Sequence, residues 1–300
     1  MSDSSSFEPV VVEWDGEGER PEIGTGLFEM PDEQFPRFPG TAQSRVKRVL
    51  KSPYHEWHYK HHPELYRRDQ KHFAFGRYLH DLLLQPGKAL GEWWIKPEGF
   101  EARSKVNKEI LAAKQDVFGH NILSFHDAEA ANRMVENARR KTTLNNLLSD
   151  GWSEVSMFWR DEETGLPCKG KMDYMKFVSS DVVAISDPKT TADASLDGFN
   201  KAMGNFEYHL QAAFYMDGLL RCLPWLKGVL WYNIPMEKEP PYEVGFYDIK
   251  QRDIVIGRDQ YRRALHTYKD CLERDEWPGY EDGLQTAELP IYYKRKYGYE

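Results

Sequence analysis

Residues 181–195 read DVVAISDPKTTADAS, and this stretch decides the fold. Its apolar first half predicts a buried strand, which ends on Asp187, Pro188 and Lys189. Side chains in a strand alternate between two faces, so Asp187 and Lys189 point to the same side. An acid and a base held together at the end of a buried strand indicate a chemical site.

The composition is typical of a soluble globular protein, because 40% of the 300 residues are hydrophobic and 29% are charged. No apolar run is long enough to span a membrane, and the opening MSDSSSFEPV lacks the features of a signal peptide, so we expect a cytoplasmic protein. The formal net charge of -8 argues against binding of nucleic acid by bulk electrostatics. Cys168, Cys222 and Cys271 form no CxxC motif and cannot alone build a zinc or iron–sulfur site.

Two parts of different character follow an acidic segment rich in glycine and proline. We expect residues 1–40 to be an extended or partly disordered arm and residues 41–300 to form one domain. Residues 41–150 carry apolar residues at helical spacing, including a helix over 69–87, whereas residues 151–280 predict the order βββαββα. Within this second part we expect a hairpin over 152–178, a strand over 181–187, a helix over 206–220, strands over 228–235 and 242–249, and a helix over 251–273. The pattern predicts an α/β fold with a mixed central sheet flanked by helices.

The acid-x-lysine pattern of Asp187 and Lys189 is weak by itself, because it also occurs at residues 69–71 and 248–250. The first of these copies lies at the start of a predicted helix and the second at a junction between a predicted strand and helix, where surface charge explains them. Only the copy at Asp187 ends an apolar strand that follows a hairpin, and that hairpin carries another acid, Asp173.

Asp173 and Asp187 at neighbouring strand ends suit the binding of Mg²⁺ or Mn²⁺, which prefer oxygen ligands. The backbone carbonyl of Pro188 offers a further oxygen. A lysine on the same strand face, Lys189, can orient water and stabilise negative charge on a phosphate. This combination indicates hydrolysis of a phosphodiester.

Three ordered segments resemble the PD-(D/E)-x-K nuclease superfamily: GKMDY at 170–174, ISDPKTT at 185–191 and YHLQAAFYMDGL at 208–219. More narrowly, the chain resembles the RecB-like branch and its RecE-type, exodeoxyribonuclease VIII-like, exonucleases. LKSPYHEW at 50–57 and FAFGRYLHDLLLQP at 73–86 are similar to the front segments of that family. The resemblance covers residues 42 to about 290 and implies a restriction-endonuclease-like core behind an α-helical N-terminal half.

The resemblance also implies a role for each matching residue. His80, Asp173, Asp187 and the carbonyl of Pro188 would hold Mg²⁺ or Mn²⁺. Asp173, Asp187, Lys189 and Gln211 would be catalytic, and Gln211 and Tyr215 would contact DNA phosphate. Thr190 and Thr191 stand where hydroxyl groups can bind a backbone phosphate, and Glu154 is a possible outer acid. Pro188 departs from the leucine that is more frequent before the lysine, and the cysteines of iron–sulfur branches are missing.

By this resemblance, the protein degrades linear double-stranded DNA, from 5′ to 3′, and leaves single-stranded tails for recombination. A ring-shaped homo-oligomer, trimer or tetramer, and a single-strand annealing recombinase as partner are implied as well, with the host cytoplasm as the location if a phage encodes the chain. Two alternatives stay open: a RecB-like nuclease for particular DNA structures or single strands, and a non-catalytic nucleic-acid-binding module with the same fold.

Overall fold

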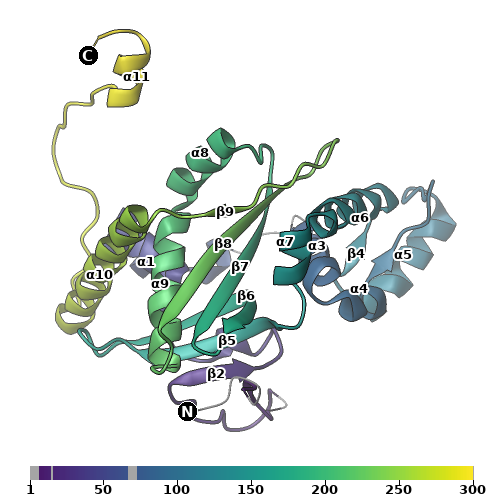
Figure 1. Ribbon diagram of the computed structural model, residues 1–300, viewed down its shortest axis with the longest axis horizontal. Helices are drawn as coiled ribbons and strands as arrows, with labels where there is room; N and C mark the ends of the chain where they lie inside the picture. Colours follow the sequence, from purple (N-terminus) through teal and green to yellow (C-terminus); the bar gives the residue numbers. More distant parts are fainter. Residues whose placement is uncertain (1–6, 15, 67–72, 300) are drawn as a thin grey trace.

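A seven-stranded mixed sheet forms the centre of the described part of the protein (Figure 1). The computed structural model describes residues 7–14, 16–66 and 73–299. The strands lie in the order β1-β2-β5-β6-β7-β8-β9. Their bounds are β1 Val10–Val11, β2 Gly26–Glu29, β5 Trp152–Arg160, β6 Pro167–Ser179, β7 Val182–Thr191, β8 Gly228–Glu237 and β9 Tyr247–Asp248.

The sheet combines an antiparallel centre with one long parallel pair. Strands β2, β5, β6 and β7 pair antiparallel in turn. β7 and β8 run parallel in continuous register. Parallel neighbours need a crossover connection, which helices α8 (Leu196–Phe206) and α9 (Tyr208–Cys222) provide. This architecture confirms the predicted α/β fold with a mixed sheet flanked by helices.

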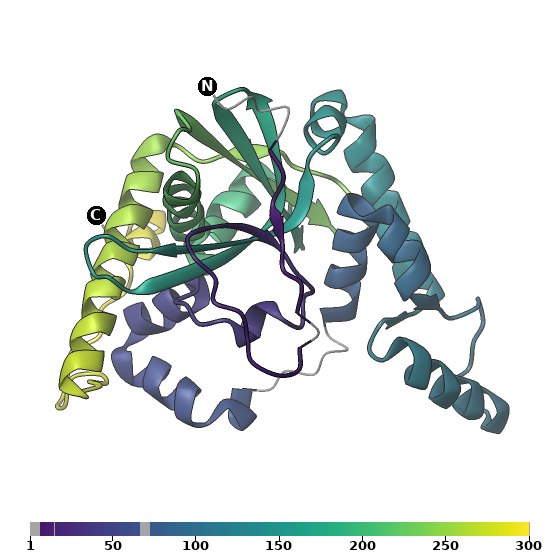
Figure 2. The same ribbon diagram turned by 90° about the horizontal axis from the view of Figure 1, so that it is seen from below.

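Two groups of helices flank the sheet, as Figures 1 and 2 show. In the first group, α9 packs on the sheet, α10 (Gln251–Arg274) packs on α9, and α1 (Gln43–Lys51) contacts both. In the second group, α3 (Ala74–Leu84) contacts β6 and β7. The other elements are α2 Pro53–His61, α4 Pro86–Glu92, α5 Lys105–Phe118, α6 Phe125–Arg140, α7 Thr142–Leu147, α11 Ile291–Lys296, the 3₁₀ turns η2 Phe35–Arg37 and η3 Pro63–Tyr66, and a small parallel pair, β3 Trp94–Ile95 and β4 Ile122–Leu123.

Strand β8 contributes side chains to both cores of the protein. Val229 and Trp231 belong to the apolar cluster that contains α9 and α10. Ile234 and Met236 belong to the cluster built with α3, α4 and α6. Because successive side chains of a strand point to opposite faces, one strand can serve both helix groups.

The same alternation along β7 positions the predicted site. Val183 and Ile185 are buried in the cluster of α9 and α10. Side chains two and four residues further on, those of Asp187 and Lys189, continue on the same face. Pro188 lies on the face of α3. The end of β7 is therefore the place where residues of both helix groups can meet.

Part of the segment described before Thr41 packs against the sheet. β2 pairs with β5, and Leu27 and Phe38 are buried. On β6, the ammonium group of Lys169 donates hydrogen bonds to the carbonyl oxygens of Phe35, at 3.0 Å, and Phe38, at 2.7 Å. The part of the expected arm that the structure describes thus extends one edge of the sheet, because strand pairing and this lysine hold its backbone.

Two local features differ from the predicted elements, and part of one predicted helix is not described. One helix is expected over 206–220, but α8 precedes α9, and Glu207, with a left-handed φ of 55°, separates the two. α8 carries Leu196, Phe199 and Met203 at helical spacing, but it buries only Phe199, and Leu196 and Phe206 are exposed. The strand expected over 242–249 is reduced to β9 and an isolated bridge at Val244. The first residues of the helix expected over 69–87 lie outside the described residues.

The C-terminal segment extends away from the sheet and ends in α11 (Figure 1). Between Pro278 and Tyr299 every residue is exposed except Lys294, which is half-buried. In the parts of the chain that the structure describes, no helix combines the length and apolar character needed to cross a bilayer.

Gly257 sets the close approach of α10 to α9. A Cβ atom at this position would lie 2.4 Å from the carbonyl oxygen of His209, a backbone atom that cannot move aside easily. We expect Gly257→Ala to lower the free energy of unfolding by about 1–3 kcal/mol, as overpacking does. Gly204→Ala on α8, where nothing lies within 4 Å, should instead stabilise the protein by about 0.5–1 kcal/mol. Urea unfolding of both variants checks this prediction, and equal effects would contradict it.

Candidate active site

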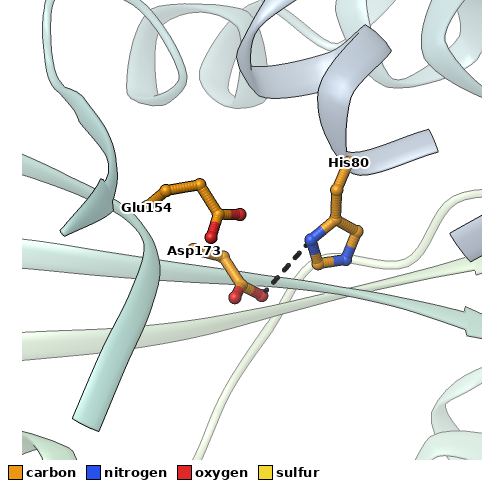
Figure 3. A group of neighbouring side chains, drawn as sticks. All are labelled: His80, Glu154 and Asp173. Carbon is orange, nitrogen blue, oxygen red and sulfur yellow. Dashed lines mark ion pairs between the residues drawn. The ribbon is translucent and has the colours of Figure 1, made fainter. Parts of the chain in front are cut away.

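Three side chains from three elements converge at the junction of the sheet and α3. His80 comes from α3, Glu154 from β5 and Asp173 from β6, and Figure 3 shows that they point toward one another. Each offers one ligand atom, and these atoms all lie within 4.8 Å of one another. In the described ranges, no other group of three histidines, cysteines or acids meets this condition.

His80 is oriented by the backbone of β7. Its Nε2 lies 3.2 Å from the carbonyl oxygen of Pro188, so the proton of the ring is assigned to Nε2, which donates to that oxygen. Nδ1 then keeps its lone pair and lies 3.9 Å from Oδ2 of Asp173. The hydrogen bond at one ring nitrogen thus leaves the other free to act as a ligand.

Asp173 carries a buried oxygen that lacks a neutralising partner. Its Oδ2 has no hydrogen bond from any described residue. Burial is the main cause that raises the pKa of this carboxyl, and the nearby acids Asp187 and Glu154 raise it further. His80 and Lys189 act in the opposite direction and lower this pKa. A buried carboxylate oxygen without a donor costs free energy unless a cation neutralises it. The two oxygen ligands and one imidazole therefore fit a divalent cation such as Mg²⁺ or Mn²⁺.

Glu154 reaches the site through an unusual backbone conformation. The pairing of Ser153 with Tyr174 places Glu154 opposite Asp173, and the φ of Glu154 is 56°, in the left-handed region. A residue other than glycine there carries strain, which the surrounding structure must offset. The ammonium group of Lys171 lies 2.9 Å from the Glu154 carboxylate and also pairs with Asp32 of the N-terminal segment. The possible outer acid of the sequence analysis thus stands inside the group.

Asp187 is buried, at 2% exposure, and accepts three hydrogen bonds. Its Oδ1 accepts from Nζ of Lys189 at 2.7 Å and from the amide of Gln211 at 3.1 Å. Its Oδ2 accepts from the amide of Asn233 at 3.0 Å, and Trp231 in turn donates to Asn233. These partners satisfy the buried charge, so Asp187 lies beside the group of His80, Glu154 and Asp173 but is not a member of it.

Lys189 is held as an ammonium ion. Burial lowers its pKa, but the carboxylates of Asp187 and Asp173 outweigh burial and raise the pKa above its ordinary value. The Nζ atom also lies 5.6 Å from the centre of the Tyr208 ring, within the range of a cation–π contact. The site therefore presents a fixed positive charge next to the acids.

The predicted phosphate contacts are distributed between the core and the end of β7. Gln211 and Tyr215 lie four residues apart on α9 and are only 7% and 8% exposed. The Gln211 amide is bonded to Asp187, and Tyr215 packs against the ring of Trp231. Thr190 and Thr191 are half-buried at the end of β7.

Two residues that the sequence analysis did not single out also border the site. Asn233 is fully buried, and an asparagine within the apolar run GVLWYNIP was a signal that could have identified it. Burial lowers the pKa of Lys47, on α1, to about 8, while Glu207 raises it and Lys189 lowers it further. Lys47 resembles any lysine on the polar face of a helix, so only the tertiary structure reveals its position.

The sheet, the acid on β6 and the Asp-x-Lys at the end of β7 define a domain of the PD-(D/E)-x-K type. The chain belongs to the family described as "PDDEXK-like domain of unknown function (DUF3799)", which matches residues 42–288. The restriction-endonuclease-like core expected from the sequence is thereby confirmed. No curated protein matches the chain significantly.

Among solved structures, the chain is similar to a "Putative exonuclease" from Eubacterium rectale. The two share 14% identity with a TM-score of 0.56, over 89% of this chain and 98% of that one. The likeness shows a common fold. A second structure, of the protein SSO0001, has 15% identity and a TM-score of 0.24, over 64% of this chain and 84% of that one, and this score is too low to support an argument.

Replacement of Asp173 separates metal binding from folding. At Mn²⁺ about 100-fold above its Kd, binding should stabilise the natural protein by about 2.7 kcal/mol, and Asp173→Asn should lose this gain. Without metal, the variant should unfold at or above the natural midpoint, because a neutral amide replaces a carboxylate whose charge burial disfavours. Thermal unfolding with and without Mn²⁺ tests both effects. Asp197→Asn, at an exposed acid of α8, is the control that keeps the Mn²⁺ response.

Proposed function

We propose that this protein is a metal-dependent exodeoxyribonuclease, similar to the RecE type, that degrades linear double-stranded DNA from its 5′ ends and leaves single-stranded tails. The observation that carries the proposal is the end of β7, where Lys189 lies 2.7 Å from Asp187 beside the group of His80, Glu154 and Asp173. The PDDEXK-like family and the neighbour called an exonuclease support a nuclease of this fold.

His80, Glu154 and Asp173 would hold the metal ion. When bound, Mg²⁺ or Mn²⁺ supplies positive charge that polarises the phosphodiester and lowers the pKa of water. The chain itself orients these ligands: the carbonyl of Pro188 fixes the ring of His80, and Lys171 fixes the carboxylate of Glu154.

Lys189 supplies the charge that the reaction needs at the phosphate. Negative charge on a phosphodiester increases and redistributes as the attacking oxygen approaches, and a fixed ammonium group stabilises that charge more in the transition state than in the ground state. Asp187 holds the ammonium in place and is itself held by Gln211 and Asn233. We therefore propose positioning roles for Gln211 and Asn233. The role of Asp187 as a metal ligand stays a prediction, because protein donors occupy both of its oxygens.

The assembly and the partner implied by the resemblance also stay predictions. A ring of three or four subunits around the duplex would let a chain of net charge -8 stay on DNA, since topology can replace charge attraction. A single-strand annealing recombinase would take up the tails that digestion leaves. Recombination is the process in which both activities are used.

Lys189→Ala should remove cleavage while the protein stays folded. Loss of one group that stabilises transition-state charge costs about 10²–10³ in kcat. Lys250→Ala is the matched control, because Lys250 belongs to another acid-x-lysine pattern and is exposed at the start of α10. Both variants are compared by the rate of release of acid-soluble nucleotides from linear duplex. Equal rates for the two variants would disprove the assignment of the site.

The form of the DNA and the metal ion test the type of nuclease. We expect digestion of linear duplex but not of closed circles, with Mg²⁺ or Mn²⁺ but not with Ca²⁺, because Ca²⁺ is larger and polarises its ligands less. Duplex labelled separately at each terminus reports the polarity. Equal attack on circles would favour an endonuclease, and binding without cleavage would favour a non-catalytic module.

A further inference from the structure

Helix α2 and the turn after it carry a surface made of aromatic rings. Eight of the thirteen residues from 54 to 66 are tyrosine, tryptophan or histidine. Only Glu56 is buried on α2, whereas Tyr54 is 47% and Tyr59 37% exposed. The ring of His61 is also exposed, and that of Trp57 is half-buried. Aromatic side chains usually supply core area, so a helix that buries an acid and none of its rings requires an explanation.

The buried acid explains how α2 is held to the domain. Glu56 accepts hydrogen bonds from Nε of Arg45 at 2.7 Å and from Nε of Arg48 at 2.6 Å, both on α1. This double ion pair attaches α2 to α1, and the guanidinium of Arg48 also lies 3.8 Å from the centre of the Tyr59 ring. No ring of α2 is fully buried. Figure 2 shows α1 and α2, in violet and blue, at the outside of the molecule near α10.

Three rings of α2 are already stacked on one another. The Tyr54 and Trp57 rings lie 5.7 Å apart with 12° between their planes, and the Trp57 and His61 rings lie 4.4 Å apart with 27° between theirs. Spacings of three and four residues place these side chains along one face of the helix. Near-parallel rings along one face of a helix offer flat apolar surfaces on which nucleobases can stack.

The charge around the rings has the sign that suits a nucleic acid. Residues 43–62 contain five lysines and arginines but a single acid, Glu56, a formal charge of +4 within a chain of -8. α2 begins two residues after α1 ends, and α1 carries Lys47, which borders the active site. The ring surface is therefore connected to the site through a basic helix.

We propose that the ring surface, defined as Tyr54, Trp57 and His61, binds a single strand of DNA by stacking on its bases, while basic residues of α1 and α2 contact its phosphates. This inference rests on the proposed function, since a nuclease that resects duplex generates such a strand. Stacking on aromatic rings tolerates every base, so the surface holds the strand without selecting its sequence.

The test is the affinity for a fluorescent oligothymidylate of about 20 nucleotides, longer than the site of a single domain, measured by anisotropy in the presence of EDTA. The double variant Tyr54→Leu with Trp57→Leu keeps apolar area but removes two rings. We expect its binding to be at least about ten-fold weaker. Replacement of both residues by phenylalanine should keep binding within about two-fold of the natural protein.

The C-terminal segment offers a matched control. Tyr292 and Tyr297 are 72% and 55% exposed and stand near a basic cluster, so their replacement by leucine removes two comparable rings elsewhere. Circular dichroism and the unfolding midpoint verify that each variant is folded. If the double variant does not fold, Tyr54→Leu alone replaces it, with an expected loss of about five-fold.

Three results would overturn the inference. The first is unchanged binding of the strand by the folded α2 variant, and the second is an equal loss of affinity in the C-terminal control. The third is a change of the α2 variant from oligomer to monomer in light scattering, which would make the ring surface an interface between copies of the chain. Because binding is measured without metal, digestion of linear duplex by the natural protein is a separate result. If the natural protein digests duplex but the double variant binds the single strand as well as the natural protein does, the ring surface is rejected and the proposed nuclease is not. If the natural protein does not digest duplex, the proposed nuclease is rejected, and the binding measurement still decides whether the ring surface binds a single strand.

Discussion

The structure depends on the burial of one negative charge, the carboxylate of Asp187. A charge removed from water destabilises a fold unless donors satisfy it, and this carboxylate has three protein donors, from β7, α9 and β8. Each donor belongs to a different element of the βαβ crossover. The crossover must therefore close in one register, and this register also places Lys189. The hydrogen bonds that stabilise the buried carboxylate are thus the same contacts that position the lysine for chemistry.

The neighbouring group of His80, Glu154 and Asp173 has the opposite character. Oδ2 of Asp173 has no donor among the described residues, and Glu154 occupies a left-handed backbone position. Hydrogen-bond donors of the protein satisfy the carboxylate of Asp187, whereas an oxygen of Asp173 is left for a cation. The contrast separates the roles of the two acids, since a satisfied carboxylate holds a lysine and an unsatisfied one attracts a metal ion.

The N-terminal half of the domain serves the site from two directions. α3 delivers His80, and the Lys171–Asp32 pair ties Glu154 to the N-terminal segment, which the composition alone presented as a loose arm. α1 brings Lys47 to the site and, through Glu56, holds α2 with its rings turned outward. Because this ion pair holds the helix, the face of Tyr54, Trp57 and His61 need not be buried, and Tyr54 and His61 stay exposed to a ligand.

The sequence by itself determined the α/β class and the strand that ends on Asp187 and Lys189, because strand and helix periods and strand ends are local properties of the chain. His80 was singled out only by the resemblance to the nuclease superfamily, and Asp173 by its place in the hairpin before that strand. The helical spacing of Leu196, Phe199 and Met203 also marks α8, which the predicted elements omit, but no pattern in the sequence indicated the position of Lys47. Only the tertiary structure decided that Glu154 joins His80 and Asp173, and that Asn233 completes the shell of Asp187. Which side chains share a buried charge depends on contacts between segments far apart in the sequence, and no local pattern encodes such contacts.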